Sequence, residues 1–286
     1  MAIILVRYSE IGLKSTPVRI RFENKLKDNI LSMFASDGVE ALVTKHDARY
    51  FIETEHIEDA IRSLKKVFGV ASVSVAEVCT SDMEDIKKTA AEYSRGKIAQ
   101  GQSFAVKARR EGDKHPYTSM DVGREAGSAI FDANTDVGAR VDLTKPDVVF
   151  YVEVRNNKAY VFGSYIRCHA GFPVGTQGRV IADIDDDRGV VSAWLMMKRG
   201  CKVFARGKAD LSLLAGYDPD FKDMSTMDNY PKKILGLVKG TELNDIGSVD
   251  VTQFEIPVFF PTVGMTDEDV SAVIEIMKKE TSAPSF

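Results

Sequence analysis

The stretch RVIADIDDDRGVVSAWLMMKRGCKVFARG, residues 179–207, decides the fold of the C-terminal third of the chain. Residues 180–184 form a short apolar run that is typical of a buried strand. Residues 190–200 have a helical pattern, and residues 201–207 read as a second strand. A strand, a helix and a strand in this order predict a βαβ unit with parallel strands, as in α/β nucleotide-binding domains. Two further strands are expected at 232–240 and 254–261, and a closing helix at 267–279.

The N-terminal segment has a different order of elements. Its apolar spacing predicts β-α-β-β-α followed by a last strand, which is the order of a ferredoxin-like α+β unit. The expected elements are a strand at 3–8, a helix at 18–34, strands at 41–45 and 49–54, a helix at 57–68 and a strand at 70–78.

A second α/β unit follows. Ser81 and Glu84 have the spacing of a capping box for a helix that runs to Tyr93. We then expect a strand at 103–110, a helix at 120–134 and a hairpin of strands 148–155 and 158–166, joined by the turn pair Asn156-Asn157. The stretch 169–178 is rich in glycine and proline and marks a linker. The predicted domains are therefore residues 1–78, 79–168 and 179–286, with 169–178 as the linker.

Composition and charge narrow the class of protein. The chain has 286 residues, of which 44% are hydrophobic and 28% are charged. The first apolar run, residues 2–6, is too short for a signal peptide or a bilayer span, so we expect a cytoplasmic protein without a membrane partner. Residues 1–178 hold 25 Lys and Arg against 24 Asp and Glu, whereas 179–286 hold 13 against 18. A polyanionic partner would therefore meet the N-terminal two domains.

The strand at 103–110 carries the candidate RNA contacts. Alternation places Phe104, Val106 and Ala108 on one face and Lys107 and Arg109 on the other. Cations beside hydroxyls and aromatic rings suit a sugar-phosphate backbone and a stacked base, although the same pattern also fits a solvated strand face. The candidate RNA-binding residues are Lys107, Arg109, Arg110, Lys114, His115 and Tyr117, with Arg7, Lys14 and Arg21 as an N-terminal set that also fits an ordinary charged helix surface.

Four stretches of the sequence resemble one family. ILVRYSEIGLKS, with RIRFENKLKDNI after it, is similar to the N-terminal ferredoxin-like domain of the tRNA 4-thiouridine synthetase (tRNA sulfurtransferase) family. FAVKARREGDKHPYTSMDVGREAG resembles its THUMP domain, an RNA-binding module, and GFPVGTQG resembles the linker into its ATP-pyrophosphatase (PP-loop) domain. The resemblance is nearly collinear over residues 1–201. It implies tRNA as the partner, gripped at its acceptor end by the THUMP domain, and a homodimer.

The third domain departs from the family at its nucleotide loop. Family enzymes have SGGxDS there, whose glycines let backbone N–H groups approach the ATP phosphates. The residues in that place here are Ile184, Asp185, Asp186, Asp187, Arg188 and Gly189. At roughly 6 Å and an effective dielectric near 20, each pair of like charges costs about 2–3 kcal/mol, so these carboxylates would repel a triphosphate.

Three interpretations of the aspartates remain open. They cap or flank the following helix, they bind Mg²⁺, or they belong to a surviving nucleotide site, and in each case Arg188 is expected to neutralise them in part. We therefore expect a degenerate PP-loop domain with no metal and no cofactor; ATP and Mg²⁺ enter only if the loop is active.

Cysteine usage bears on catalysis. The family's sulfur transfer needs a cysteine, and none occurs in residues 202–286; Cys79, Cys168 and Cys201 lie far apart without a CxxC pair. We expect no catalytic residue and a tRNA-binding protein that presents tRNA to a thiolation partner or acts as a tRNA chaperone. The alternatives are an active tRNA sulfurtransferase with an Asp-rich, Mg²⁺-assisted loop, and a Mg²⁺-dependent phosphotransferase unrelated to RNA.

Overall fold

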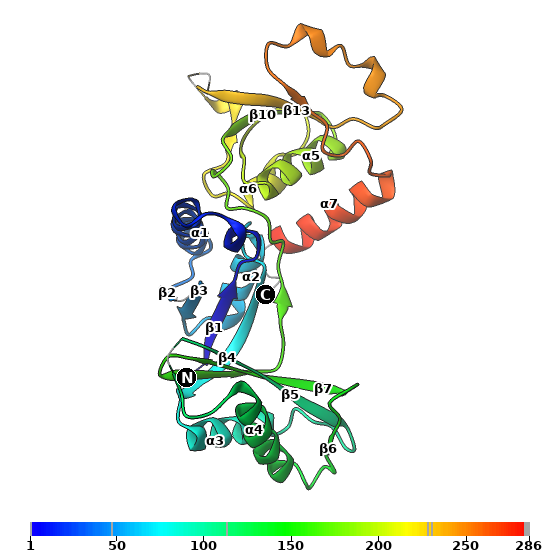
Figure 1. Ribbon diagram of the computed structural model, residues 1–286. Coiled ribbons are helices and arrows are strands. Elements are labelled where there is room, and N and C mark those ends of the chain that lie inside the picture. The colour runs from blue at the N-terminus through cyan, green and yellow to red at the C-terminus, as the bar shows by residue number, and fades with distance from the viewer. Residues whose placement is uncertain (1, 47, 113, 228, 230, 283–286) are drawn as a thin grey trace. The chain divides into compact units, whose positions relative to one another are not determined.

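The computed structural model describes residues 2–46, 48–112, 114–227, 229 and 231–282 (Figure 1). Contacts between residues divide the chain into two compact units. The first unit holds residues 1–6, 42–57 and 73–166, and the second holds 7–41, 58–72 and 167–286. Each unit combines segments from more than one predicted domain, so the predicted domain boundaries stay predictions.

The elements up to residue 80 occur in the predicted order. Helix α1 has a proline in its first turn and ends at Gly38, whose φ of 71° is the left-handed conformation that glycine favours. The helices and strands are β1 (Ala2–Arg7), the 3₁₀ helix η1 (Glu10–Leu13), α1 (Thr16–Asp37), β2 (Leu42–His46), β3 (Arg49–Glu53), α2 (Ile57–Lys66) and β4 (Ser72–Thr80).

The next segment confirms the predicted helices and hairpin with two corrections. The N-cap of α3 is Asp82, whose carboxylate accepts the Glu84 N–H, and not Ser81. The predicted strand 158–166 ends at Phe162 and pairing resumes only at Ile166. The elements are α3 (Met83–Ser94), β5 (Ser103–Glu111), α4 (Ser119–Ala133), β6 (Arg140–Val141), β7 (Val148–Arg155), β8 (Lys158–Phe162) and β9 (Ile166–Arg167).

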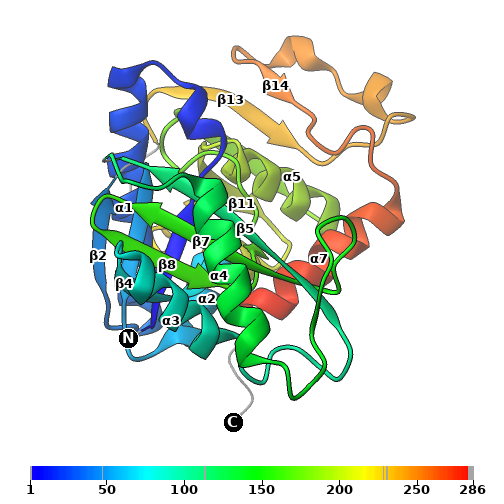
Figure 2. The same ribbon diagram turned by 60° about the horizontal axis from the view of Figure 1, so that its bottom comes forward.

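These strands form one mixed sheet in the order β2-β3-β1-β4-β8-β7-β5-β6 among the described residues, with β9 paired to β4. Strands β5 and β7 run parallel, and β7 and β8 form the antiparallel hairpin. Helices α3 and α4 cover one face of β5, β7 and β8 with an apolar core, and Figure 2 shows α4 crossing this part of the sheet. Tyr151, Phe162 and Phe51 belong to a separate apolar cluster on the strands.

The second unit contains the predicted βαβ pattern. Strands β10 and β11 are parallel and flank α5 in the sequence, as expected. Of the predicted strand 254–261, only two residues pair. The elements are β10 (Arg179–Ile184), α5 (Asp187–Lys198), β11 (Lys202–Gly207), α6 (Ser212–Ala215), β12 (Lys222–Asp223), η2 (Met224–Thr226), β13 (Ile234–Lys239), η3 (Ile246–Ser248), η4 (Val251–Gln253), β14 (Val258–Phe259) and α7 (Asp267–Thr281).

The parallel sheet of the second unit has the order β12-β11-β10-β13-β14. The chain places β11 and β12 on one side of β10 and then crosses to place β13 and β14 on the other. The carboxyl end of β10 is therefore the topological switch point, where open α/β sheets bind their ligands. Helices α5 and α7 pack on one face of this sheet through a shared apolar core, and Asp185 and Asp186 connect β10 to α5 at the switch point.

No α-helix in the part of the chain that the structure describes has the length and apolar character needed to cross a bilayer.

Candidate functional site

Lys107 and Arg109 lie where the strand pattern predicts. Both side chains are exposed on β5, whereas Phe104, Val106 and Ala108 pack toward α3 and α4. In the parallel register Lys107 stands opposite Tyr151 and Arg109 opposite Glu153 on β7. The two cations therefore share the face of the strand that the helices do not cover.

The other candidates on and after β5 do not extend that face. Arg110 has the alternation parity of Ala108, so its Cβ lies on the helix side of the strand. Tyr117 packs against the core under α3 and α4, and its hydroxyl donates to the Ser81 carbonyl. The His115 ring stacks on Tyr117 with centroids 5.1 Å apart. These candidates therefore do not lie on one surface: Arg110 and Tyr117 belong with the helix side of β5, whereas Lys107 and Arg109 lie on the opposite face.

Contacts within the protein hold the Tyr117 side chain in place, so it is not displayed for contact with RNA. Partial burial raises its pKa, and a hydrogen bond to Ser81 opposes this rise. Lys114 is exposed in the loop before α4. Of the three loop candidates, only Lys114 has an exposed side chain.

The N-terminal candidates Arg7, Lys14 and Arg21 belong to the second unit, whereas the residues of β1 before Arg7 belong to the first. Arg7 is only 7% exposed, so it is a buried residue at the end of β1 and not a surface contact. The Lys14 ammonium lies 4.8 Å from the centre of the Phe172 ring. Arg21 is exposed on α1. Among these three, Arg21 alone has the exposure of a surface phosphate contact.

At the switch point, Asp186 is a helix cap. Its carboxylate accepts the Gly189 N–H at 2.8 Å, the bond that an N-cap residue makes to the first turn of a helix. Asp185 and Asp187 are exposed beside it. The anion at this helix N-terminus is therefore supplied by the chain itself, which matches the capping interpretation.

Gly240, just after β13, closes the same helix end. A Cβ at this position would lie 2.4 Å from the Gly189 nitrogen and 2.6 Å from the Arg188 carbonyl carbon. The backbone of Gly240 thus packs directly on the first turn of α5. Sequence reasoning missed this residue, because a single glycine after a strand carries no sign of what it packs against.

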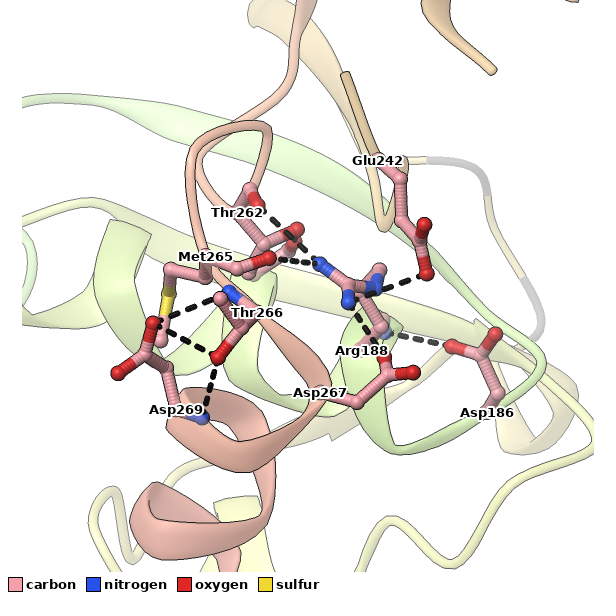
Figure 3. A network of polar contacts seen from close by, with 10 residues as sticks. Asp186, Arg188, Glu242, Thr262, Met265, Thr266, Asp267 and Asp269 are labelled. Atoms are coloured by element: carbon pink, nitrogen blue, oxygen red, sulfur yellow. Dashed lines mark hydrogen bonds and ion pairs between the residues drawn. The ribbon is translucent and has the colours of Figure 1, made fainter. Parts of the chain in front are cut away.

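Arg188 does not neutralise the neighbouring aspartates, contrary to the sequence-based expectation. Its side chain is buried and points toward the segment before α7, away from Asp186 (Figure 3). One guanidinium nitrogen donates to the carbonyls of Thr262 at 3.2 Å and Met265 at 3.0 Å. The other lies 2.7 Å from Asp267 and 3.2 Å from Glu242. Arg188 therefore fastens the start of α5 to two later segments.

A second ion cluster joins three strand ends. The Asp183 carboxylate on β10 lies 2.6 Å from the Arg206 guanidinium on β11 and 3.1 Å from the Lys239 ammonium on β13. Partial burial raises the pKa of Asp183, but the hydrogen bonds from Arg206 and Lys239 outweigh it and hold the pKa below its ordinary value. An internal carboxylate thus engages two cations close to the switch point.

Possible metal ligands and cysteine thiols are two further kinds of side chain that bear on chemistry. Within the described ranges, no three or more His, Cys, Asp or Glu side chains are grouped so as to hold a metal ion. Burial raises the pKa of Cys168 to about 12 and also raises that of Cys201. Burial of these two thiols thus favours the protonated form over the thiolate.

Sequence comparisons identify two domains. The family model of the ThiI ferredoxin-like domain matches residues 3–74, and the model of the THUMP domain matches residues 80–163. A probable tRNA sulfurtransferase from Methanosarcina acetivorans is 41% identical over 205 residues, which cover 70% of this chain and 49% of that protein. One from Methanobrevibacter smithii is 39% identical over 209 residues, which cover 71% and 52%. The chain spans about half the length of these relatives.

Two solved structures have the same fold. PH1313 from Pyrococcus horikoshii superposes with a TM-score of 0.81 at 26% identity, covering 97% of this chain and 99% of that one. A 4-thiouridine synthetase in complex with RNA and bound ATP superposes with a TM-score of 0.79 at 20% identity, covering 100% and 87%. Through its ThiI ferredoxin-like and THUMP domains, the chain belongs to the tRNA sulfurtransferase (4-thiouridine synthetase) family.

Proposed function

We propose that this chain binds tRNA through the exposed cations of β5 in its THUMP domain and presents that tRNA to a partner thiolation enzyme. Its α/β unit does not grip ATP through a phosphate loop of its own. The observation that carries the proposal is the placement of Lys107 and Arg109, two exposed cations on the face of β5 that α3 and α4 leave uncovered. Cations placed in this way neutralise RNA phosphates without needing a particular base sequence.

The choice of tRNA follows from the family. The relatives are named tRNA sulfurtransferases, and one structure of the same fold is an RNA complex. Dimerisation in a cytoplasmic setting is part of the same proposal, by analogy with the family.

The proposal that ATP phosphates are not bound at the start of α5 rests on the loop between β10 and α5. A phosphate-binding turn needs unoccupied N–H groups at the helix end and room for backbone to approach the ligand. Here the Asp186 carboxylate already accepts from Gly189, and Gly240 packs on the same turn. A triphosphate entering this place would displace the cap and meet the charges of Asp185 and Asp187.

The experiment measures how tRNA affinity depends on salt. Replacing Lys107 and Arg109 together with alanine should weaken tRNA binding and flatten the slope of log K against log salt concentration by about two units, because two phosphate contacts are lost. Filter binding between 50 and 200 mM salt provides the slope.

The matched control removes the same charge elsewhere in the unit. Lys88 and Lys145 are exposed, and replacing both with alanine also changes the net charge by two. This control should bind tRNA with nearly the wild-type slope. If the two double variants behave alike, the RNA contact does not lie on β5.

A further inference from the structure

A cavity of about 650 Å³ lies at the amino ends of the parallel strands of the second unit. Strands β10, β11 and β12 contribute their first residues to its lining, which are Arg179, Lys202 and Lys222. Helix α1 supplies another part of the lining, and all of the described residues that line the cavity belong to this unit. The switch point lies at the opposite, carboxyl end of β10, so this cavity is separate from the loop before α5.

Much of the lining is apolar and closely packed. Phe204 on β11, Met33 on α1 and Phe68 after α2 are buried side chains that border the cavity. The Phe68 ring stacks on that of Tyr217, which also lines the cavity, with centroids 5.5 Å apart and planes 20° from parallel. A cavity of this size with an apolar lining and a small number of polar groups is typical of a site for a small organic molecule.

Two of the cations in the lining are already neutralised by carboxylates. The Lys202 ammonium lies 2.7 Å from the Asp218 carboxylate and 3.0 Å from that of Asp220. The Asp220 carboxylate also lies 2.6 Å from the Lys222 ammonium. These four side chains therefore compensate one another and offer a ligand little net charge.

Lys25 and Arg179 differ, because no carboxylate of the described residues lies within 4.0 Å of either side-chain cation. Arg179 donates to the Lys232 carbonyl at 3.2 Å and keeps further N–H donors. Lys25 is half-buried, and its Cε lies 3.1 Å from the place of a Cβ at Gly175, so its stem is held against the linker. Asp28 is the carboxylate without an ion-pair partner among the described lining residues. Two unpaired cations and one unpaired carboxylate suit a ligand with a single negative charge.

We propose that this cavity binds a small monocarboxylate with a flat apolar body, whose carboxylate meets Lys25 and Arg179 and whose body lies against Phe204. The guanidinium group presents a planar pair of N–H donors that matches the two oxygens of a carboxylate. A phosphate monoester carries up to about two negative charges, and the second would be uncompensated near Asp28. The site goes beyond the proposed function and does not depend on RNA binding by β5.

Isothermal calorimetry on the wild-type chain tests the class of ligand with three probes that share one ring system. We expect 2-naphthoate to bind with a dissociation constant below about 1 mM. The neutral 2-naphthamide should bind about tenfold more weakly, because it keeps the ring and lacks the charge. The third probe, 2-naphthyl phosphate, should bind no more tightly than 2-naphthoate. Equal affinities for 2-naphthoate and 2-naphthamide, no binding of 2-naphthoate, or tighter binding of the phosphate would each overturn the proposal.

A pair of double variants tests the place of binding. Replacing Lys25 and Arg179 together with glutamine should weaken the binding of 2-naphthoate about tenfold and leave that of 2-naphthamide unchanged. The matched control is Lys208→Gln with Lys279→Gln, because both lysines are exposed, lie outside the lining and remove the same charge. This control should bind 2-naphthoate as wild type does. Equal losses in the two double variants would show that general charge attraction, and not this cavity, holds the carboxylate.

Discussion

Replacing Arg188 with methionine is expected to lower the free energy of unfolding of the second unit by about 3 kcal/mol. The Arg188 side chain is buried, and methionine keeps much of its length but none of its donors. The carbonyls of Thr262 and Met265 would then lose charge-assisted hydrogen bonds in a site with little access to water. Of the polar contacts between α5 and the segment before α7, the one between the Ser192 and Thr262 hydroxyls would remain, at 2.8 Å.

Urea unfolding followed by tryptophan fluorescence measures this loss. Trp194 is the one tryptophan of the sequence and lies in α5, so its emission reports the unit in question. The control is Arg199→Met at the C-cap of the same helix, where the side chain is 64% exposed and lies 3.6 Å from Glu10. Exposed ion pairs contribute about 0–1 kcal/mol, so this control should change little. Equal losses in the two variants would show that Arg188 does not fasten these segments.

Replacing Gly240 with alanine is expected to destabilise the same unit by about 3 kcal/mol. The new methyl group would fall 2.4 Å from the Gly189 nitrogen and 2.6 Å from the Arg188 carbonyl carbon. Both are backbone atoms of the first turn of α5 and cannot rotate away as a side chain does. Either β13 or the helix must shift, and that shift disturbs the cap made by Asp186.

Two other glycines provide the matched control. A Cβ at Gly247 or at Gly264 would meet no atom within 4 Å, so the same substitution there should change stability by less than about 0.5 kcal/mol. The measurement is again urea unfolding followed by Trp194. A Gly240→Ala protein as stable as the Gly264→Ala protein would contradict the close packing at the helix end.

The sequence predicts the elements that local pattern determines. The apolar run before Asp185 and the helical pattern after Gly189 correctly indicate β10 and α5, because each is set by residues close together in the chain. Alternation likewise places Lys107 and Arg109 on one face of β5. The same rule, applied one residue further, already separates Arg110 from that face.

The sequence cannot predict contacts made across long separations. Arg188 bonds to residues 74 to 79 positions further along the chain, and nothing in the local pattern names them. The contact of Gly240 with the first turn of α5 also joins residues far apart in the chain, so no local pattern indicates it. Tyr151 and Glu153 share one parity in β7, but the register that sets them opposite Lys107 and Arg109 is a property of the sheet. Tyr165 follows β8 at a point where the expected strand is interrupted.

The proposed function makes different demands on the two units. The cations of β5 need only an exposed strand face, whereas an ATP grip needs unoccupied backbone donors at the start of α5. Asp186 occupies such a donor and Gly240 covers the turn.

Titration of Mg²⁺ and ATP into the full chain by isothermal calorimetry, with and without saturating tRNA, tests this account most directly. We expect no binding tighter than about 1 mM in either case, since the helix end is already capped and the neighbouring carboxylates repel the phosphates. A micromolar dissociation constant for ATP, alone or with tRNA, would contradict it.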